Sequence, residues 1–141
     1  MNVNVRSILT KIDELATVLQ INNVDIAFVT ETWLCDEKPA ELVDIENYVC
    51  YCNDRRDGRR GGGVALYIKS NLPCQRLSDF EEANVESLWL LYRATRMPRQ
   101  ITHVVIGAVY HPPDGDNKVM NSHMLNNLDN ITRRHPMLAS Y

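Results

Sequence analysis

The chain has 141 residues, of which 45% are hydrophobic and 23% charged, and its formal net charge is −3. This describes one ordinary globular domain, and a negative charge gives no general attraction to nucleic acid, so contact with DNA would need a local basic patch or a bound cation. No apolar run is long enough to cross a membrane and the first residues lack a signal-peptide pattern, so we expect an intracellular protein of the nucleus or cytoplasm, with no membrane partner.

The first predicted elements are a short strand, a helix and a buried strand. Apolar residues recur at steps of four, three and four and therefore share one helix face: Ile8, Ile12, Leu15 and Leu19. Ser7 is placed to cap the start of this helix, and Asn4 before it would end the first strand. The apolar, β-branched run 24–29 then predicts a strand that ends at Thr30 and Glu31.

A long irregular excursion is predicted from Cys35 to about Arg60, because turn-forming residues interrupt it and no period is sustained. Three glycines at 61–63 end it and open a predicted strand over 64–68, and further strands are predicted over 87–92 and 103–110. After a turn at 111–117, four apolar residues predict one face of a second helix: Met120, Met124, Leu128 and Ile131. This order suggests sheets with helices packed outside them, in one domain.

The four cysteines are scattered along the chain at Cys35, Cys50, Cys52 and Cys74. Only two of them are close, and the Cys-x-Cys spacing differs from the paired spacing of a zinc knuckle. The pattern favours reduced thiols of no special role, with disulfides and a zinc site as the less favoured alternatives.

Glu31 is a candidate metal ligand because it lies at the C-terminal end of a predicted strand that is made mostly of Val, Ile, Ala and Phe. A carboxylate there emerges at the rim of a sheet, where loops gather and ligands bind. Mg²⁺ prefers oxygen ligands and takes one or two protein carboxylates, so a single Glu could serve as its main ligand. A solvated strand end explains the same residue and, on position alone, is the favoured alternative.

Two neutral polar side chains are predicted at the ends of other strands. Asn4 would lie beside the strand that carries Glu31, where an amide can hold a carboxylate or phosphate oxygen. Tyr110 ends its strand just before Pro112, and a phenol there can donate to a phosphate oxygen. The ordinary alternatives are a helix-entry residue for Asn4 and a partly buried aromatic for Tyr110.

The glycine turn and the arginines before it form the one basic segment of the chain. The turn could cradle a phosphate, but it leads into a strand rather than a helix, so a tight turn is the better interpretation. Four arginines could contact a nucleic-acid backbone, although a solvated loop fits them as well: Arg55, Arg56, Arg59 and Arg60. The four histidines show no metal-ligand spacing, and none is assigned a catalytic role.

Five segments of the sequence follow one another in an order that is far more specific to one protein family than any single segment is. They are Asn-Val-Arg-Ser at 4–7 with 11–15, Thr-Glu-Thr-Trp-Leu at 30–34, Arg-Gly-Gly-Gly with the strand at 60–68, Glu-Ser-Leu-Trp at 86–89, and Val-Tyr-His-Pro-Pro at 109–113. Together they resemble the endonuclease domain of LINE-like non-LTR retrotransposons, a branch of the endonuclease/exonuclease/phosphatase superfamily. The match runs from Asn4 to about the second predicted helix.

The resemblance implies the α/β (α+β) class, as a four-layered DNase I-like sandwich of two β-sheets with outer helices, incomplete toward the C-terminal side over residues 1–141. It implies a Mg²⁺ held by Glu31 with Asn4 beside it, and a contact between Tyr110 and the scissile phosphate. In this superfamily an Asp and His pair activates the attacking water and the metal stabilises the developing charge.

The resemblance also implies DNA as the partner, with Arg59, Arg60 and His111 facing it. His111 departs from the family pattern, because relatives commonly carry Arg at that place. The family continues with Gly-Asp-x-Asn, which positions the nucleophile and stabilises the transition state, and with Ser-Asp-His, which supplies the general base. This sequence ends at Tyr141 without either segment.

We therefore expect the N-terminal part of a DNA-nicking endonuclease that is inactive alone and accompanied by a reverse transcriptase in its full-length parent. Two alternatives remain open at this stage. One is a non-catalytic remnant or binding module, and the other is a superfamily member such as an apurinic-site repair nuclease or a phosphatase.

Overall fold

The computed structural model describes residues 1–34, 40–55, 61–93, 98 and 101–134. The helices of this part of the chain are α1 (Ile12–Ile21), α2 (Asn117–Arg134) and two short 3₁₀ helices, η1 (Ala40–Val43) and η2 (Ser78–Phe80). The strands are β1 (Asn2–Asn4), β2 (Ile26–Thr30), β3 (Tyr48–Asn53), β4 (Val64–Lys69), β5 (Cys74–Arg76), β6 (Glu86–Tyr92) and β7 (Val104–Tyr110).

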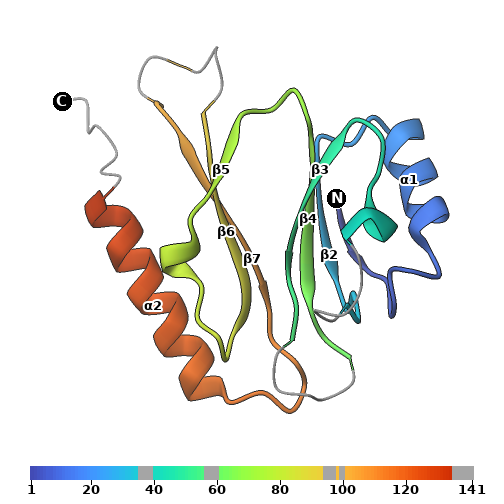
Figure 1. Cartoon of the computed structure of the whole chain (residues 1–141). Helices are drawn as coiled ribbons and strands as arrows, with labels where there is room; N and C mark the ends of the chain where they lie inside the picture. Colours follow the sequence, from blue (N-terminus) through green and yellow to red (C-terminus); the bar gives the residue numbers. More distant parts are fainter. Residues whose placement is uncertain (35–39, 56–60, 94–97, 99–100, 135–141) are drawn as a thin grey trace.

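The strands form two sheets that lie face to face, with one helix outside each (Figure 1). The first sheet has the order β1-β2-β4-β3 and is covered by α1, and the second has the order β5-β6-β7 and is covered by α2. This arrangement confirms the mixed, four-layered fold class that the resemblance implied. No helix in the described part of the chain is long and apolar enough to cross a bilayer.

Alternation along the strands gives the first sheet a core on each face. Val29 and Tyr67 are buried with Leu19 of α1 on the outer face. Leu66, the neighbour of Tyr67, is buried with Leu88 between the two sheets. Successive residues of a strand point to opposite faces, so β2 and β4 contribute side chains to both cores. Their sequences are therefore nearly continuous apolar runs.

Helix α1 begins at Ile12, so the predicted cap at Ser7 is wrong. The backbone N–H groups of Ser7 and Ile8 instead donate to the carbonyl oxygens of Glu31 and Thr32, each at 2.9 Å. These bonds prolong the pairing of β1 with β2 past the ends of both strands. A local sequence signal could not reveal this, because the competing partner lies more than twenty residues away.

The prediction of an irregular excursion is wrong for 48–53, which form β3, and β5 was not predicted either. Tyr48 and Cys50 pack against the core under α1, whereas Tyr51 packs against the core between the sheets. Both faces of β3 are therefore partly apolar, and the sequence lacks the polar alternation by which a half-buried strand is recognised.

Helix α2 packs on the second sheet through polar side chains, and the buried residues of this helix are His123 and Asn127. His123 Nε2 lies 3.0 Å from Ser87 Oγ, and its Nδ1 lies 3.0 Å from Glu82 Oε1. Leu128, predicted on the apolar face, is 51% exposed. The helix was predicted correctly, but its packing face was partly wrong because hydrogen-bonding side chains occupy the centre of the contact.

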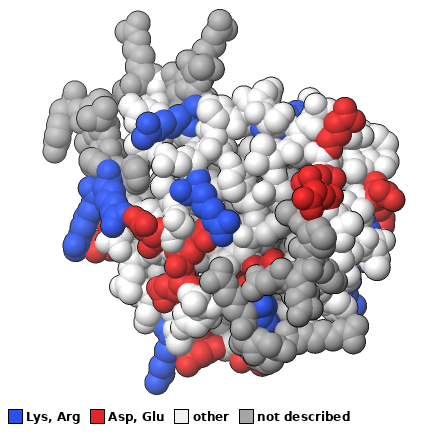
Figure 2. Space-filling model, viewed as in Figure 1, with Lys and Arg blue, Asp and Glu red and all other residues white. Residues whose placement is uncertain are grey.

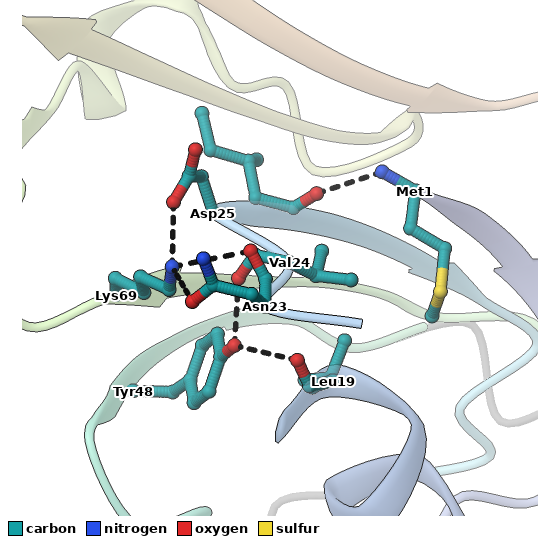
Figure 3. Close-up of polar contacts among 8 residues, drawn as sticks. Met1, Leu19, Asn23, Val24, Asp25, Tyr48 and Lys69 are labelled. Atoms are coloured by element: carbon teal, nitrogen blue, oxygen red, sulfur yellow. Dashed lines mark hydrogen bonds and ion pairs between the residues drawn. The ribbon is translucent and has the colours of Figure 1, made fainter. Parts of the chain in front are cut away.

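Polar contacts close the end of the first sheet where β2 and β3 begin (Figure 3). Lys69 Nζ donates to the carbonyl and side-chain oxygens of Asn23 at 3.1 and 2.6 Å and to Asp25 Oδ1 at 2.7 Å. Tyr48 OH donates to the carbonyl oxygen of Val24 at 2.6 Å. These bonds fix the turn between α1 and β2, and with it the start of the strand that leads to Glu31.

Candidate functional site

Strand ends from both sheets meet at the opposite end of the sandwich, the lower edge in Figure 1, where β7 turns toward α2. The last rung of the first sheet consists of Asn4, Thr30, Val64 and Asn53. In the second sheet the last rung of β6 and β7 pairs Glu86 with Tyr110. The side-chain amide of Asn53 donates to the carbonyl oxygen of Ser87 at 2.8 Å and joins the sheets at this end.

The carboxylate of Glu31 is held by donors from three segments of the chain. Tyr110 OH donates to Oε1. Oε2 accepts from Trp33 Nε1 at 2.6 Å and from the Gly62 amide at 3.1 Å. Glu31 and Trp33 have left-handed backbone conformations, with φ of 58° and 56°, which are uncommon for residues other than glycine and cluster at functional sites.

Hydrogen bonding keeps the Glu31 carboxyl group ionised. Burial pushes its pKa upward, but the hydrogen bonds from Tyr110 and Trp33 outweigh that effect. The Gly62 amide and the charge of Arg55 act in the same direction, so the pKa of Glu31 lies below its ordinary value of 4.5. Burial, and then the hydrogen bond to Glu31, raise the pKa of Tyr110 to about 12. The pair is thus a carboxylate and a neutral phenol at neutral pH.

The three glycines form a turn that holds two carboxylates. Gly61, Gly62 and Gly63 have φ of 93°, 75° and 83°. While the Gly62 amide donates to Glu31, the Gly63 amide donates to Glu86 Oε2. The tight turn favoured by the sequence is confirmed, and successive amides of this turn are directed at carboxylates.

A partly buried ion pair lies beside this turn. Arg55 Nε donates to Glu86 Oε1 at 2.6 Å, and Arg55 Nη2 lies 2.6 Å from the same oxygen. The two side chains are 10% and 12% exposed. Arg55 follows β3 and Glu86 begins β6, so the pair links the two sheets. The alternative of a solvated loop is therefore wrong for Arg55, while its contact with a nucleic-acid backbone stays a prediction.

A cavity of about 310 Å³ opens beside these residues. Arg55, Glu86, Tyr110 and His111 are among its lining residues. The His111 side chain is exposed and its Nε2 lies 2.8 Å from Asn117 Oδ1. The cavity therefore brings a partly buried cation, a phenol and an imidazole to the edge where Glu31 lies.

The charge on the visible face is mixed (Figure 2). Acidic and basic side chains are interspersed on the side of the view that carries α2, and acidic ones prevail on the side that carries α1. The described residues of this face thus offer no continuous basic surface to a DNA backbone.

The sequence model of the endonuclease/exonuclease/phosphatase family matches residues 1–136. The chain belongs to this family. The endonuclease domain of TRAS1, a telomere-specific non-LTR retrotransposon, has a similar structure, with a TM-score of 0.64 at 12% sequence identity. The AP endonuclease LMAP from Leishmania major is also similar, with a TM-score of 0.61 at 18% identity.

The two structural alignments each cover 94% of this chain, but 51% of the TRAS1 domain and 46% of the Leishmania enzyme. The chain therefore spans about half the length of either solved structure. No curated protein sequence matches it. At these identities the two likenesses establish a shared fold.

In this family member, three of the predicted site residues lie at one end of the sandwich. Asn4 and Glu31 share it because β1 and β2 are parallel, with Asn4 opposite Thr30. Tyr110 reaches Glu31 from the other sheet. The catalytic roles of these residues remain predictions, and Arg59 and Arg60 lie outside the described residues.

Sequence reasoning assigned no site role to Trp33, Glu86 or the glycine amides. Glu86 carried a usable signal, because it stands at the boundary of an apolar strand just as Glu31 does. Trp33 lies only two residues after Glu31 and carries an N–H donor. The directions of backbone amides have no such signal, since they depend on how the turn is folded.

The hydrogen bonds that Glu31 accepts leave room on its carboxylate for one further contact. A carboxylate has about four acceptor positions, and three are taken, one on Oε1 and two on Oε2. One position on Oε1 remains for a monodentate contact, and the exposed side chain of Asn4 lies at the same edge. Among the described residues, no three His, Cys, Asp or Glu side chains gather as a metal site.

Proposed function

We propose that this chain supplies the metal-binding and phosphate-contacting half of a Mg²⁺-dependent phosphodiesterase site that nicks DNA, within a retrotransposon-type protein. The contact between Glu31 at the end of β2 and Tyr110 at the end of β7 carries the proposal. It joins an ionised carboxylate to a neutral phenol at an edge beside a cavity. Membership of the family and the similarity to two endonuclease structures support it.

Each residue has a distinct proposed role. Glu31, with Asn4 beside it, would hold Mg²⁺, which when bound offsets negative charge on a phosphoryl oxygen. Tyr110 has a single O–H, which it donates to Glu31 here, so contact with a phosphate oxygen requires the phenol to change its acceptor. Arg55 and Glu86 would hold the two sheets in register around the phosphate.

We propose that residues outside this half-site activate the attacking water. His123 is 1% exposed and sits within the packing of α2. His111 is exposed and contacts Asn117. Losing general-base assistance costs about 10²- to 10⁴-fold in rate, and losing a preorganised transition-state donor costs roughly 10²- to 10³-fold. We therefore expect this chain alone to leave supercoiled plasmid uncut above background in the presence of Mg²⁺.

A chimera tests the proposal directly. Joining residues 1–136 to the C-terminal half of a family endonuclease should yield Mg²⁺-dependent nicking of supercoiled plasmid. Glu31→Gln should abolish that nicking, because the amide cannot supply the anionic ligand. Glu41→Gln is the matched control, since Glu41 is an exposed carboxylate in η1 and should leave nicking unchanged.

Two results would count against the proposal. Nicking by the chimera that survives Glu31→Gln would reject the metal site. Mg²⁺-dependent and Glu31-dependent cleavage by the 141-residue chain alone would place the catalytic base within it.

A further inference from the structure

Cys50 and Cys52 form a pair of touching thiols outside the site described above. They stand two residues apart on β3, so their side chains leave the same face of the strand. Their sulfur atoms lie 3.3 Å apart. Both side chains are partly buried against the core under α1. Within the described residues β3 is the outer strand of its sheet, with β4 as its one neighbouring strand.

The geometry permits a disulfide between these thiols but strains it. Two residues of extended strand span about 6.6 Å, close to the upper limit of about 6.8 Å between the Cα atoms of a disulfide. The sulfur atoms would also have to close from 3.3 Å to a bond length of about 2.05 Å. Disulfides strained in this way are readily reduced, so the pair suits reversible chemistry rather than a permanent cross-link.

The two thiols are not equivalent. The hydrogen bond between the two thiols lowers the pKa of Cys50, although burial opposes this effect. The same hydrogen bond, together with burial, raises the pKa of Cys52. Since the thiolate is the nucleophile in disulfide exchange, Cys50 is the sulfur that attacks first.

We propose that Cys50 and Cys52 are a reversible dithiol–disulfide pair that reacts with low-molecular-weight disulfides of the glutathione type. The Cys50 thiolate attacks one sulfur of glutathione disulfide and releases a glutathione thiolate, leaving a mixed disulfide. The Cys52 thiolate then attacks the Cys50 sulfur and releases the second glutathione. The two thiol protons pass to the two glutathione thiolates, and the protein gives up two electrons to the glutathione disulfide.

Closure of this disulfide acts on the edge where Glu31 lies. Asn53 directly follows Cys52 and donates to the carbonyl oxygen of Ser87. Two residues further, Arg55 pairs with Glu86. Because the closed disulfide strains β3, these two contacts between the sheets loosen on oxidation and re-form on reduction.

Mass spectrometry of the whole chain tests the pairing. The reduced protein is incubated with glutathione disulfide, its remaining thiols are alkylated, and it is cleaved after Glu46 and Arg55. Peptide 47–55 contains Cys50 and Cys52 but neither Cys35 nor Cys74. We expect this peptide to carry no alkyl group and to be lighter than its reduced, unalkylated form by the mass of two hydrogen atoms. Excess reduced glutathione should restore the two free thiols.

The serine variants separate the two steps. Cys52→Ser should stop at a mixed disulfide of Cys50 with glutathione, and Cys50→Ser should form far less adduct because it lacks the attacking sulfur, whereas Cys74→Ser should leave the internal disulfide unaffected. Full alkylation of peptide 47–55 in the wild-type chain, or its glutathione adduct without an internal disulfide, would overturn the proposal. This readout needs no variant to fold.

Hydrogen exchange tests the link to the edge. Backbone amides at 53–55 and at 86–87 should exchange faster in the oxidised chain than in the reduced chain, while amides of α2 keep their protection. Equal protection of 53–55 in the two forms would overturn the coupling to the site.

Discussion

Glu31 owes its ionised state to its donors, because burial alone would raise its pKa. Those donors come from three segments that all follow it in the sequence, at increasing separation. Trp33 is its near neighbour, Gly62 lies in the turn before β4, and Tyr110 ends a strand of the other sheet. The pKa of this one carboxyl group therefore depends on the correct placement of both sheets and of the glycine turn.

The stability of the protein should therefore depend on pH through Glu31. Its folded-state pKa lies below the ordinary 4.5, so its contribution is fully present above pH 4.5 and is lost as pH falls through the folded-state value. We expect the difference in free energy of unfolding between wild type and Glu31→Gln to shrink as pH is lowered from neutrality to about pH 3. Urea unfolding at a series of pH values measures this difference.

Tyr110→Phe sharpens that measurement. It removes the strongest of the donors that lower the pKa of Glu31, so the pH dependence that Glu31 contributes should be weaker in this variant. A difference between wild type and Glu31→Gln that stays constant across the acid range would show that the carboxylate does not sense these hydrogen bonds.

Position 63 requires a glycine because of its backbone conformation and because of the side chain beside it. Its φ is 83°, and a Cβ there would collide with Thr32 Oγ1. We expect Gly63→Ala to lower the free energy of unfolding by about 1–3 kcal/mol, as for other residues forced into this region. It should also displace the Gly63 amide, from which Glu86 accepts a hydrogen bond. Hydrogen exchange of the amides at 62 and 63 would measure this displacement.

A double-mutant cycle separates collision from backbone strain. Thr32 Oγ1 is buried without a hydrogen-bond partner among the described residues, so Thr32→Ala should itself cost little through polar contacts. Gly63→Ala should cost less in the Thr32→Ala background than in wild type. Equal costs in both backgrounds would leave backbone strain as the whole effect.

At the scale of elements, α2 is oriented by one buried amide. Asn127 Nδ2 donates to the carbonyl oxygen of Phe80 at 2.8 Å and lies 3.1 Å from His123 Nε2. Because a carbonyl can only accept, this bond fixes which end of the amide faces His123. His123 Nε2 must then be an acceptor, and its Nδ1–H donates to Glu82.

Asn127→Ala should therefore weaken the docking of the whole helix. It leaves the Phe80 carbonyl oxygen and His123 Nε2 without this donor, which costs about 1–3 kcal/mol for buried groups. We expect faster hydrogen exchange along α2, with β2 and β4 unaffected. Leu125→Ala is the control on the same helix, because Leu125 is 68% exposed and its loss should change protection little. Equal effects of the two substitutions would reject the polar packing of α2.

The sequence predicted the elements that carry strong apolar patterns. β2, β4, β6, β7 and α2 lie where their patterns placed them, because each buries enough apolar surface for its period or run to be visible. β3 was missed because both of its faces are partly apolar. The start of α1 was misplaced because Ser7 and Ile8 are bonded to the loop after β2 instead of to a helix.

The site was only partly predictable for a related reason. Glu31 and Tyr110 could be found because they end apolar strands, and the family resemblance marked them. Their contact depends on two sheets meeting, as does the pairing of Arg55 with Glu86. Long-range partners of this kind leave no local pattern, and Arg55 therefore resembled a solvated loop residue in the sequence.

At the scale of the molecule, the two sheets overlap over only part of their width. β6 lies over β3 and β4, and β7 lies over β4. Ile26 and Phe28 of β2 face the space between the sheets but are only partly buried. β7 is an outer strand of its sheet within the described residues, and Val104 on it is 39% exposed. An open strand edge thus lies next to an incompletely covered apolar face.

This open edge should make the chain associate with itself and bind hydrophobic dyes. Unpaired strand edges template pairing with other chains, and apolar patches larger than a few hundred Å² are unusual on monomers. Val104→Lys places a charge on the β7 edge, so it should reduce both dye fluorescence and the concentration-dependent mass seen in sedimentation. Ile21→Lys is the matched control, because Ile21 is 77% exposed but lies at the end of α1. A wild-type chain that stays monomeric without binding dye would refute this expectation, and equal effects of the two lysines would show that general apolar exposure, rather than the β7 edge, drives association.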